Sequence, residues 1–220
     1  MSVGVVVGRP KSQSKFIFFI AFWLVTIFVT YMKNQGFFDP SSPTAQHYKP
    51  ALQFLLIHGF FGALALVLGV FQLSNRLRAR YLGLHRVLGY VYAVSAFIAA
   101  PFAILVAIKI DSLSLAAATT VQSIGWVMTV AIALYCVRNG NIVQHRRWMI
   151  RSYFFAMIFT VARLLIPIPP IMALGETGIE IVVWSTIVVA AFLPTILLDW
   201  RTIVARPKTK QTMATALEDA

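Results

Sequence analysis

Six apolar stretches, each near the length of a membrane-crossing helix, dominate this sequence of 220 residues. The hydrocarbon core of a bilayer is about 30 Å thick, so a helix rising about 1.5 Å per residue needs about 20 apolar residues to cross it. Hydrophobic residues make up 59% of the chain, well above the roughly 45–50% of soluble domains. We therefore expect an all-α polytopic membrane helix bundle with six transmembrane helices, at about 16–32, 51–73, 87–109, 115–137, 148–168 and 180–200.

The connections between these stretches are short, which indicates a single transmembrane domain over residues 1–220. The longest connection covers about 33–50, and the polar, basic residues 201–220 are expected to form a short cytoplasmic tail. Because the first stretch is not followed by a small-residue cleavage site, we expect it to be retained as a span. Pro101 and Pro194 lie within apolar stretches and predict helix kinks.

Lysine and arginine residues gather on alternate connections, and this asymmetry predicts the orientation of the chain. With the N-terminus in the cytoplasm, the inner segments hold 15 of the 19 basic residues. The positive-inside rule then makes both termini cytoplasmic, as expected for a multi-pass protein of a cytoplasmic membrane. The net charge of +12 needs no nucleic-acid partner, and anionic lipids at the cytoplasmic face are the expected contact. The inner basic residues are Arg9, Lys11, Lys15, Arg76, Arg78, Arg80, Arg86, Arg138, Arg146, Arg147, Arg151, Arg201, Arg206, Lys208 and Lys210.

Several chemistries are excluded or disfavoured by residues that the chain lacks. Cys136 is the single cysteine, which excludes an internal disulfide and a cysteine-based zinc or iron–sulfur site. The HExxH, Walker and GxSxG motifs are absent from the sequence, which removes the reactions that depend on them. No carboxylate falls in the middle of an apolar stretch, whereas ion-coupled transporters are expected to carry one there. The candidates for chemistry are therefore histidines and polar residues within the spans.

Two histidines, His85 and His145, open the third and fifth apolar stretches, so the predicted topology puts both at the cytoplasmic face and at equal depth. A b-type haem takes one axial imidazole from each side, and its propionates require cations near the membrane surface. Arg86, Arg146 and Arg147 stand beside these histidines in the sequence. The group predicts a haem b site, with the histidines as iron ligands and the arginines near the propionates.

The residues that follow His85 fit this hypothesis but also a simpler one. Gly89 and Tyr92 lie about one and two turns after His85 on the same helix face, where a glycine would let a flat macrocycle approach the backbone. Alternatively, histidines and aromatic residues at this depth, among them Trp148 and Tyr153, form an ordinary interfacial belt. The sequence leaves both interpretations open.

A second group of polar residues is expected in the outer half of the membrane. His58 and Gln122 each lie about eight residues inside a stretch that enters from outside, and Arg163 reaches a similar depth. Such residues usually face a bundle interior, a cavity or a polar partner. They predict a quinone site, or a second haem on His58, for which the sequence offers no good second histidine. The alternatives are that Arg163 extends to the outer headgroups and that Gly59 and Gly62 beside His58 serve close helix packing.

Three motifs carry a resemblance to a known family. They are LGxxQ at 68–72 after His58, RxRxxxxHRxxGxxY at 78–92, and HRRWMIRSY at 145–153 followed by Arg163. Together they resemble the predicted bacterial membrane-protein family labelled domain of unknown function 2306, over about residues 50–170, and HRRWMIRSY is the most specific part. The resemblance implies a class of membrane protein and a set of signature residues, without a reaction.

The LHRVLG segment at 84–89 is also similar, more weakly, to b561-type cytochromes and ferric-reductase membrane domains. Those families generally carry four haem histidines in two pairs across the membrane. In this sequence only His85 and His145 pair by depth, so the likeness implies a single inner haem.

Three functions follow from these observations. The first is a b-type haem electron-transfer protein or quinone-linked redox protein, with a redox partner or another membrane subunit. The second is a small transporter or lipid-handling protein with a polar cavity at His58 and Arg163. The third is a non-catalytic membrane assembly subunit. The deciding feature is whether His85 and His145 face a shared space or merely lie at the same depth.

Overall fold

The computed structural model describes residues 24, 28, 31, 39 and 41–204 of the chain, with the side chains at 201 and 202 left aside. The predicted first span at about 16–32 and the basic tail therefore fall almost wholly outside the described residues. The described part is all-helical and contains no strand. Its elements are α2 (Pro43–Tyr48), the 3-10 helix η2 (Lys49–Ala51), α3 (Leu52–Gln72), α4 (Asn75–Arg80), α5 (Leu82–Ile110), α6 (Leu113–Arg138), α7 (Ile142–Leu165), α8 (Pro169–Met172) and α9 (Glu176–Val204).

Five segments of this part are long and apolar enough to cross a membrane, which agrees with the multi-pass prediction. They coincide with the second to sixth predicted stretches, and the count of six depends on 16–32, outside the described residues. The five segments are Pro43–Gln72, Leu82–Ile110, Leu113–Arg138, Ile142–Leu165 and Glu176–Trp200. Pro101 and Pro194 lie inside α5 and α9, which continue past them.

Among the helices that begin earlier than hydropathy predicts, two matter for the histidines. α5 begins at Leu82 instead of about 87, so His85 is already helical, and its backbone N–H bonds to the Tyr81 carbonyl. α7 begins at Ile142 instead of about 148, because the Asn141 side chain accepts from the Gln144 N–H and caps the helix. Polar residues end an apolar window but do not end a helix, since the backbone hydrogen bonds are unaffected by them.

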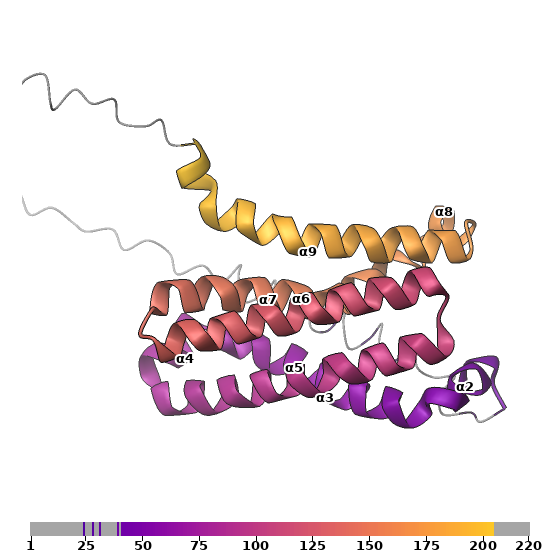
Figure 1. Cartoon of the computed structure of the whole chain (residues 1–220), viewed down its shortest axis with the longest axis horizontal. Helices are drawn as coiled ribbons and strands as arrows, with labels where there is room; N and C mark the ends of the chain where they lie inside the picture. Colours follow the sequence, from indigo (N-terminus) through magenta and orange to yellow (C-terminus); the bar gives the residue numbers. More distant parts are fainter. Residues whose placement is uncertain (1–23, 25–27, 29–30, 32–38, 40, 205–220) are drawn as a thin grey trace, which may run out of the picture.

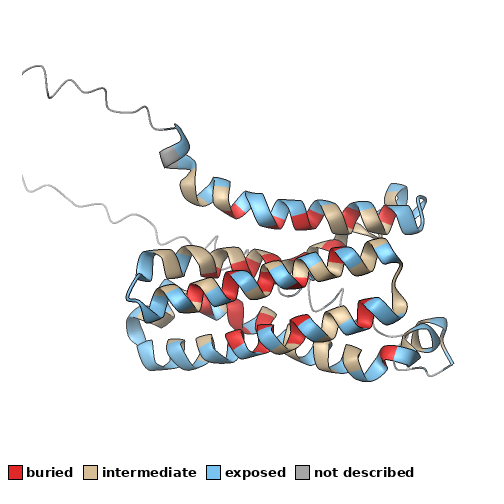
Figure 2. Cartoon of the chain, viewed as in Figure 1, coloured by how far each residue is buried: buried red, intermediate tan, exposed pale blue. Residues whose placement is uncertain are grey.

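The helices pack as a bundle in which sequence neighbours are mostly spatial neighbours. α3 packs on α5, α5 on α6, α6 on α7, and α9 mainly on α7, with a further contact between α3 and α7. Figure 1 shows α9 along the outside of this bundle, with α4 at one end and α2 and α8 at the other. Buried residues gather where the helices face one another, and exposed positions cover the outer faces (Figure 2). Those outer faces carry large apolar side chains such as Phe60, Ile108 and Phe192, as expected for helices that contact lipid.

Small residues allow the helices to approach closely. Alanines fill much of the core, and Gly69 of α3 lies against the rings of Tyr153 and Tyr92. Gly125 of α6 similarly lies under Phe155, with only 2.6 Å from a ring atom to the place a Cβ would take. This agrees with close helix packing as the role of Gly69.

A buried hydrogen-bond chain joins three helices near the inner histidines. The Trp126 indole N–H donates to the Tyr92 hydroxyl over 3.3 Å, and the Tyr92 and Ser152 oxygens are 3.0 Å apart. Since Ser152 donates its one proton to the Met149 carbonyl, Tyr92 must donate to Ser152. Tyr92 is therefore a core residue at 0% exposure, and Tyr153, at 4%, is also buried instead of belonging to an interfacial belt. These hydrogen bonds fix α5, α6 and α7 relative to one another.

Candidate functional site

A cavity of about 610 Å³, which we name the histidine cavity, contains both His85 and His145 in its wall. It lies where α3 ends, α4 follows, α5 begins, α6 ends and α7 begins, which is the end of the bundle that carries α4 in Figure 1. Small-molecule sites usually measure about 300–1,000 Å³, so the size suits a ligand larger than a few waters. Polar residues on its wall are Gln72, Asn75, Arg78, His85, Arg86, Tyr90, Arg138, His145 and Arg146.

The rest of the wall is apolar, which gives the histidine cavity an amphipathic character. The apolar residues include Leu73 directly after α3, Leu82 of α5, Leu134 of α6 and Met149 of α7. Four arginines line the same space, and no aspartate or glutamate is among the lining residues. Such a wall matches a ligand with a large apolar body and anionic groups at one edge.

His145 is held by a single hydrogen bond to the neighbouring helix. Its Nδ1 lies 2.9 Å from the Ala133 carbonyl oxygen of α6. A carbonyl only accepts, so the proton of a neutral imidazole resides on Nδ1 and the lone pair on Nε2. Metal-ligating histidines are usually oriented by a bond of this kind to a carbonyl or carboxylate. The arrangement leaves Nε2 as a donor atom for a ligand.

His85 lines the same cavity from the first turn of α5. Its backbone carbonyl accepts from the Gln72 side chain over 3.2 Å, which ties the end of α3 to the start of α5. Its Nδ1 is buried and has no hydrogen-bond partner within the described part of the chain. A buried nitrogen of this kind calls for an explanation, because most buried polar atoms are paired.

Gln72 also explains part of the role of Gly89. A Cβ at position 89 would come within 3.0 Å of the Gln72 side-chain oxygen. Gly89 lines the cavity, as expected for a residue on the face of His85. The space left by its missing side chain is occupied by Gln72.

Asn75, at the start of α4, gathers two of the cavity arginines. Its side-chain oxygen accepts from Arg78 over 2.7 Å and from Arg146 of α7 over 3.4 Å. Two guanidinium groups from different helices therefore share one neutral oxygen atom. Arg86 of α5 and Arg138 of α6 complete the basic part of the wall.

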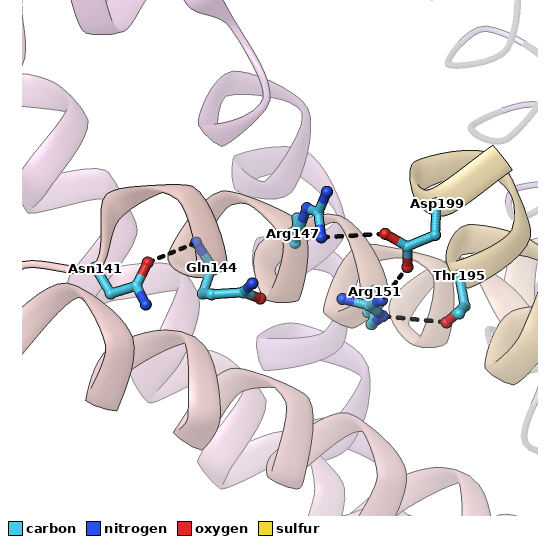
Figure 3. Close-up of polar contacts among 6 residues, drawn as sticks. All are labelled: Asn141, Gln144, Arg147, Arg151, Thr195 and Asp199. Atoms are coloured by element: carbon cyan, nitrogen blue, oxygen red, sulfur yellow. Dashed lines mark hydrogen bonds and ion pairs between the residues drawn. The ribbon is translucent and has the colours of Figure 1, made fainter. Parts of the chain in front are cut away.

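Arg147, predicted to stand with Arg86 and Arg146, lies elsewhere. It forms an ion pair with Asp199 of α9 at 3.1 Å, and Arg151 reaches the same carboxylate at 3.5 Å and the Thr195 hydroxyl at 3.2 Å (Figure 3). Successive helical residues are turned by about 100°, so Arg147 and Arg151 share the α9 face of α7 while His145 and Met149 share the cavity face. Asp199 of α9 is therefore bonded to α7.

The outer polar residues form contacts between helices. His58 Nδ1 lies 3.0 Å from the Ala99 carbonyl of α5, and the Gln122 amide donates to the Phe155 carbonyl of α7 over 3.5 Å. The Arg163 guanidinium stacks on the Phe159 ring at 4.2 Å and lies close enough to His58 to interact with it electrostatically. The fold thus brings His58 and Arg163 together, and the quinone site stays a prediction.

Five polar residues of the cavity wall were not predicted as site residues: Gln72, Asn75, Arg78, Tyr90 and Arg138. Gln72 and Arg78 belong to the LGxxQ and RxRxxxxHRxxGxxY motifs, so the motifs already contained that signal. Asn75 and Arg138 had no signal beyond position, because their role depends on where α4 and the end of α6 lie in the bundle.

The donor atoms suit a group that brings most of its own ligands. Among the described residues, no cluster of three or more histidine, cysteine, aspartate or glutamate side chains could hold a metal ion. A haem iron needs only two axial protein ligands, because the macrocycle supplies the other four. The pair His85 and His145 has that number of imidazoles, and the haem site stays a prediction.

Comparison with known proteins supports the membrane assignment. The model of a family described as "Predicted membrane protein (DUF2306)" matches residues 55–199, a range that contains the histidine cavity and Asp199. No curated protein and no solved structure matches the chain. The resemblance to that family is confirmed, whereas the weaker likeness to b561-type cytochromes and ferric reductases is not supported by these comparisons.

Proposed function

This chain belongs to the DUF2306 family of predicted membrane proteins, and we propose that its histidine cavity binds a b-type haem for electron transfer or quinone-linked redox chemistry. His85 and His145 would hold its iron. The observation that carries the proposal is that these two histidines, from α5 and α7, line one cavity of about 610 Å³. Histidines that only anchored the chain at the interface would have no need to line the same cavity.

The surroundings of the histidines support this ligand class. The Ala133 carbonyl keeps the proton of His145 on Nδ1 and leaves Nε2 for the iron. Apolar residues such as Leu134 and Met149 would contact the macrocycle, and Arg86 and Arg146 would hold the propionates. When bound, the haem would supply one-electron redox chemistry, and the residues of the chain would orient it and exclude water from its apolar faces.

For the outer half, a structural role is supported by a specific observation. His58 and Gln122 each bond to a carbonyl of a neighbouring helix, which fits the assembly-subunit hypothesis for these residues. A quinone at His58, Gln122 and Arg163, or a transported solute at His58 and Arg163, would have to replace these bonds. We retain the quinone as a proposal that depends on the inner haem.

An absorption spectrum tests the haem proposal. Protein purified in detergent from haem-replete cells should show b-type bands that sharpen on reduction with dithionite. His85→Ala and His145→Ala should each remove these bands, because one axial ligand is lost, while His58→Ala should keep them. Gel filtration of each variant checks that the bundle remains folded. A colourless and monodisperse wild-type preparation would refute the proposal.

A further inference from the structure

The two arginines that converge on Asn75 form no ion pair with an acidic residue in the part of the chain that the structure describes. Arg78 and Arg146 donate to the same amide oxygen over 2.7 and 3.4 Å, so two positive charges stand close together around a neutral atom. Like charges at such a separation repel, and the repulsion is only partly screened near a protein surface. An amide oxygen accepts their hydrogen bonds but neutralises neither charge.

Helix α7, which carries Arg146, also carries two arginines whose charge is neutralised within the protein. Arg147 and Arg151 form ion pairs with the Asp199 carboxylate at 3.1 and 3.5 Å. The charge of these two arginines is therefore partly neutralised by an acidic residue of the protein itself. In the histidine cavity the position between the arginines is filled by Asn75, and none of the lining residues is acidic. An oxyanion from outside the chain would complete the second pair as Asp199 completes the first.

Local structure holds the three residues in place. The Ser74 hydroxyl accepts from the Leu77 N–H and caps α4, which fixes Asn75 and Arg78 on its first turn. Arg146 follows His145, whose bond to Ala133 fixes the start of α7 against α6. The backbone of both arginines is thus positioned before any ligand binds, which reduces the entropic cost of binding.

We propose that Arg78, Asn75 and Arg146 form an oxyanion clamp that binds a carboxylate or phosphate group of an amphipathic ligand in the histidine cavity. Arg86 and Arg138, on the same wall, add attraction without sharing the Asn75 oxygen. The inference rests on the proposed function in one respect, because a bound haem would make the oxyanion a propionate. The phosphate of a lipid headgroup and free phosphate have the same chemistry.

Esterification of the propionates provides a direct test. Haem b and its dimethyl ester share the macrocycle, but the ester lacks the negative charges. Titrated into haem-free protein in neutral detergent and followed by absorbance, the wild type should bind haem b about tenfold or more tightly than the ester. Arg78→Gln and Arg146→Gln should each remove most of this preference. Arg80→Gln is the matched control, since Arg80 lies on α4 over the Tyr81 ring and does not line the cavity.

Two further probes separate this inference from the haem proposal. Native mass spectrometry would measure the binding of short-chain phosphatidylglycerol and of inorganic phosphate to wild type and the same variants. If the protein binds either probe through Arg78 and Arg146 but binds no haem, the result would support the clamp and overturn the haem proposal. Equal affinity for haem b and its ester would overturn the clamp and would still support the haem proposal. Absence of binding by every probe would overturn both.

Discussion

Arg146 and Arg147 are neighbours in the sequence, yet they belong to two different regions of the molecule. Arg147 joins α7 to α9 through the Asp199 carboxylate, whereas Arg146 joins α7 to α4 through the neutral Asn75 oxygen. The first contact is complete within the chain and serves packing. The second leaves positive charge facing a cavity, and this difference identifies the region where a ligand is expected. A cluster of arginines in a sequence is therefore not one functional unit.

The largest change in stability is expected from removing the ion pairs of Asp199. Asp199→Asn should lower the free energy of unfolding by about 1–3 kcal/mol, because Arg147 and Arg151 lose their shared partner. This lies between the values for exposed and fully buried pairs, since the Asp199 side chain is 27% exposed. Thermal unfolding in detergent measures the change. Asn75→Ala should cost less than about 1 kcal/mol, and an equal cost would contradict the distinction between the two regions.

A smaller change in stability, in the opposite direction, should follow when Arg78 and Arg146 are also given a carboxylate partner. Asn75→Asp places a carboxylate between Arg78 and Arg146 and should raise stability by about 0.5–1 kcal/mol at low salt, less at high salt. The same variant should bind haem b less tightly, because the internal carboxylate competes for the arginines. Melting curves at two salt concentrations, combined with the haem titration, measure both. A destabilised Asn75→Asp protein would show that the two arginines do not favour an anion.

The smallest effect is expected at Asp111, a carboxylate without an arginine partner in the described part of the chain. Burial raises the pKa of Asp111 above its usual value, and the charge of His47 partly offsets this. An acid whose pKa is raised on folding stabilises the fold below the unfolded pKa and loses this contribution as pH rises through the folded pKa. Asp111→Asn should therefore raise the melting temperature slightly at pH 7 and leave it unchanged at pH 3. A loss of stability at pH 7 would mean that the carboxylate has a favourable partner.

Much of the fold could be predicted from the sequence because lipid imposes a simple requirement. The five described spans agree with predicted stretches, since any segment in hydrocarbon must be apolar and helical. The helix starts were misplaced by five or six residues at α5 and α7, because a hydropathy window stops at the polar residues Arg86 and Arg147 while helical hydrogen bonding continues past them.

The candidate site was predictable only in part. His85, His145, Arg86 and Arg146 do line one cavity, as their equal predicted depth suggested. Arg147 does not, and Tyr92 turned out to be a buried hydrogen-bonding residue. Depth in the membrane follows from counting residues along a helix. The direction in which a side chain points depends on how each helix is rotated against its neighbours.

The sequence by itself determined the class of protein, the approximate position of the five described spans and the group of histidines and arginines near one end. These properties follow from apolar length and from charge, which are summed along the chain. Only the tertiary structure decided which arginine meets Asp199 and which meets Asn75, and that His85 and His145 share a cavity. Those outcomes depend on contacts between α3, α4, α5, α6, α7 and α9, which are set by close packing at residues such as Gly69 and Gly125.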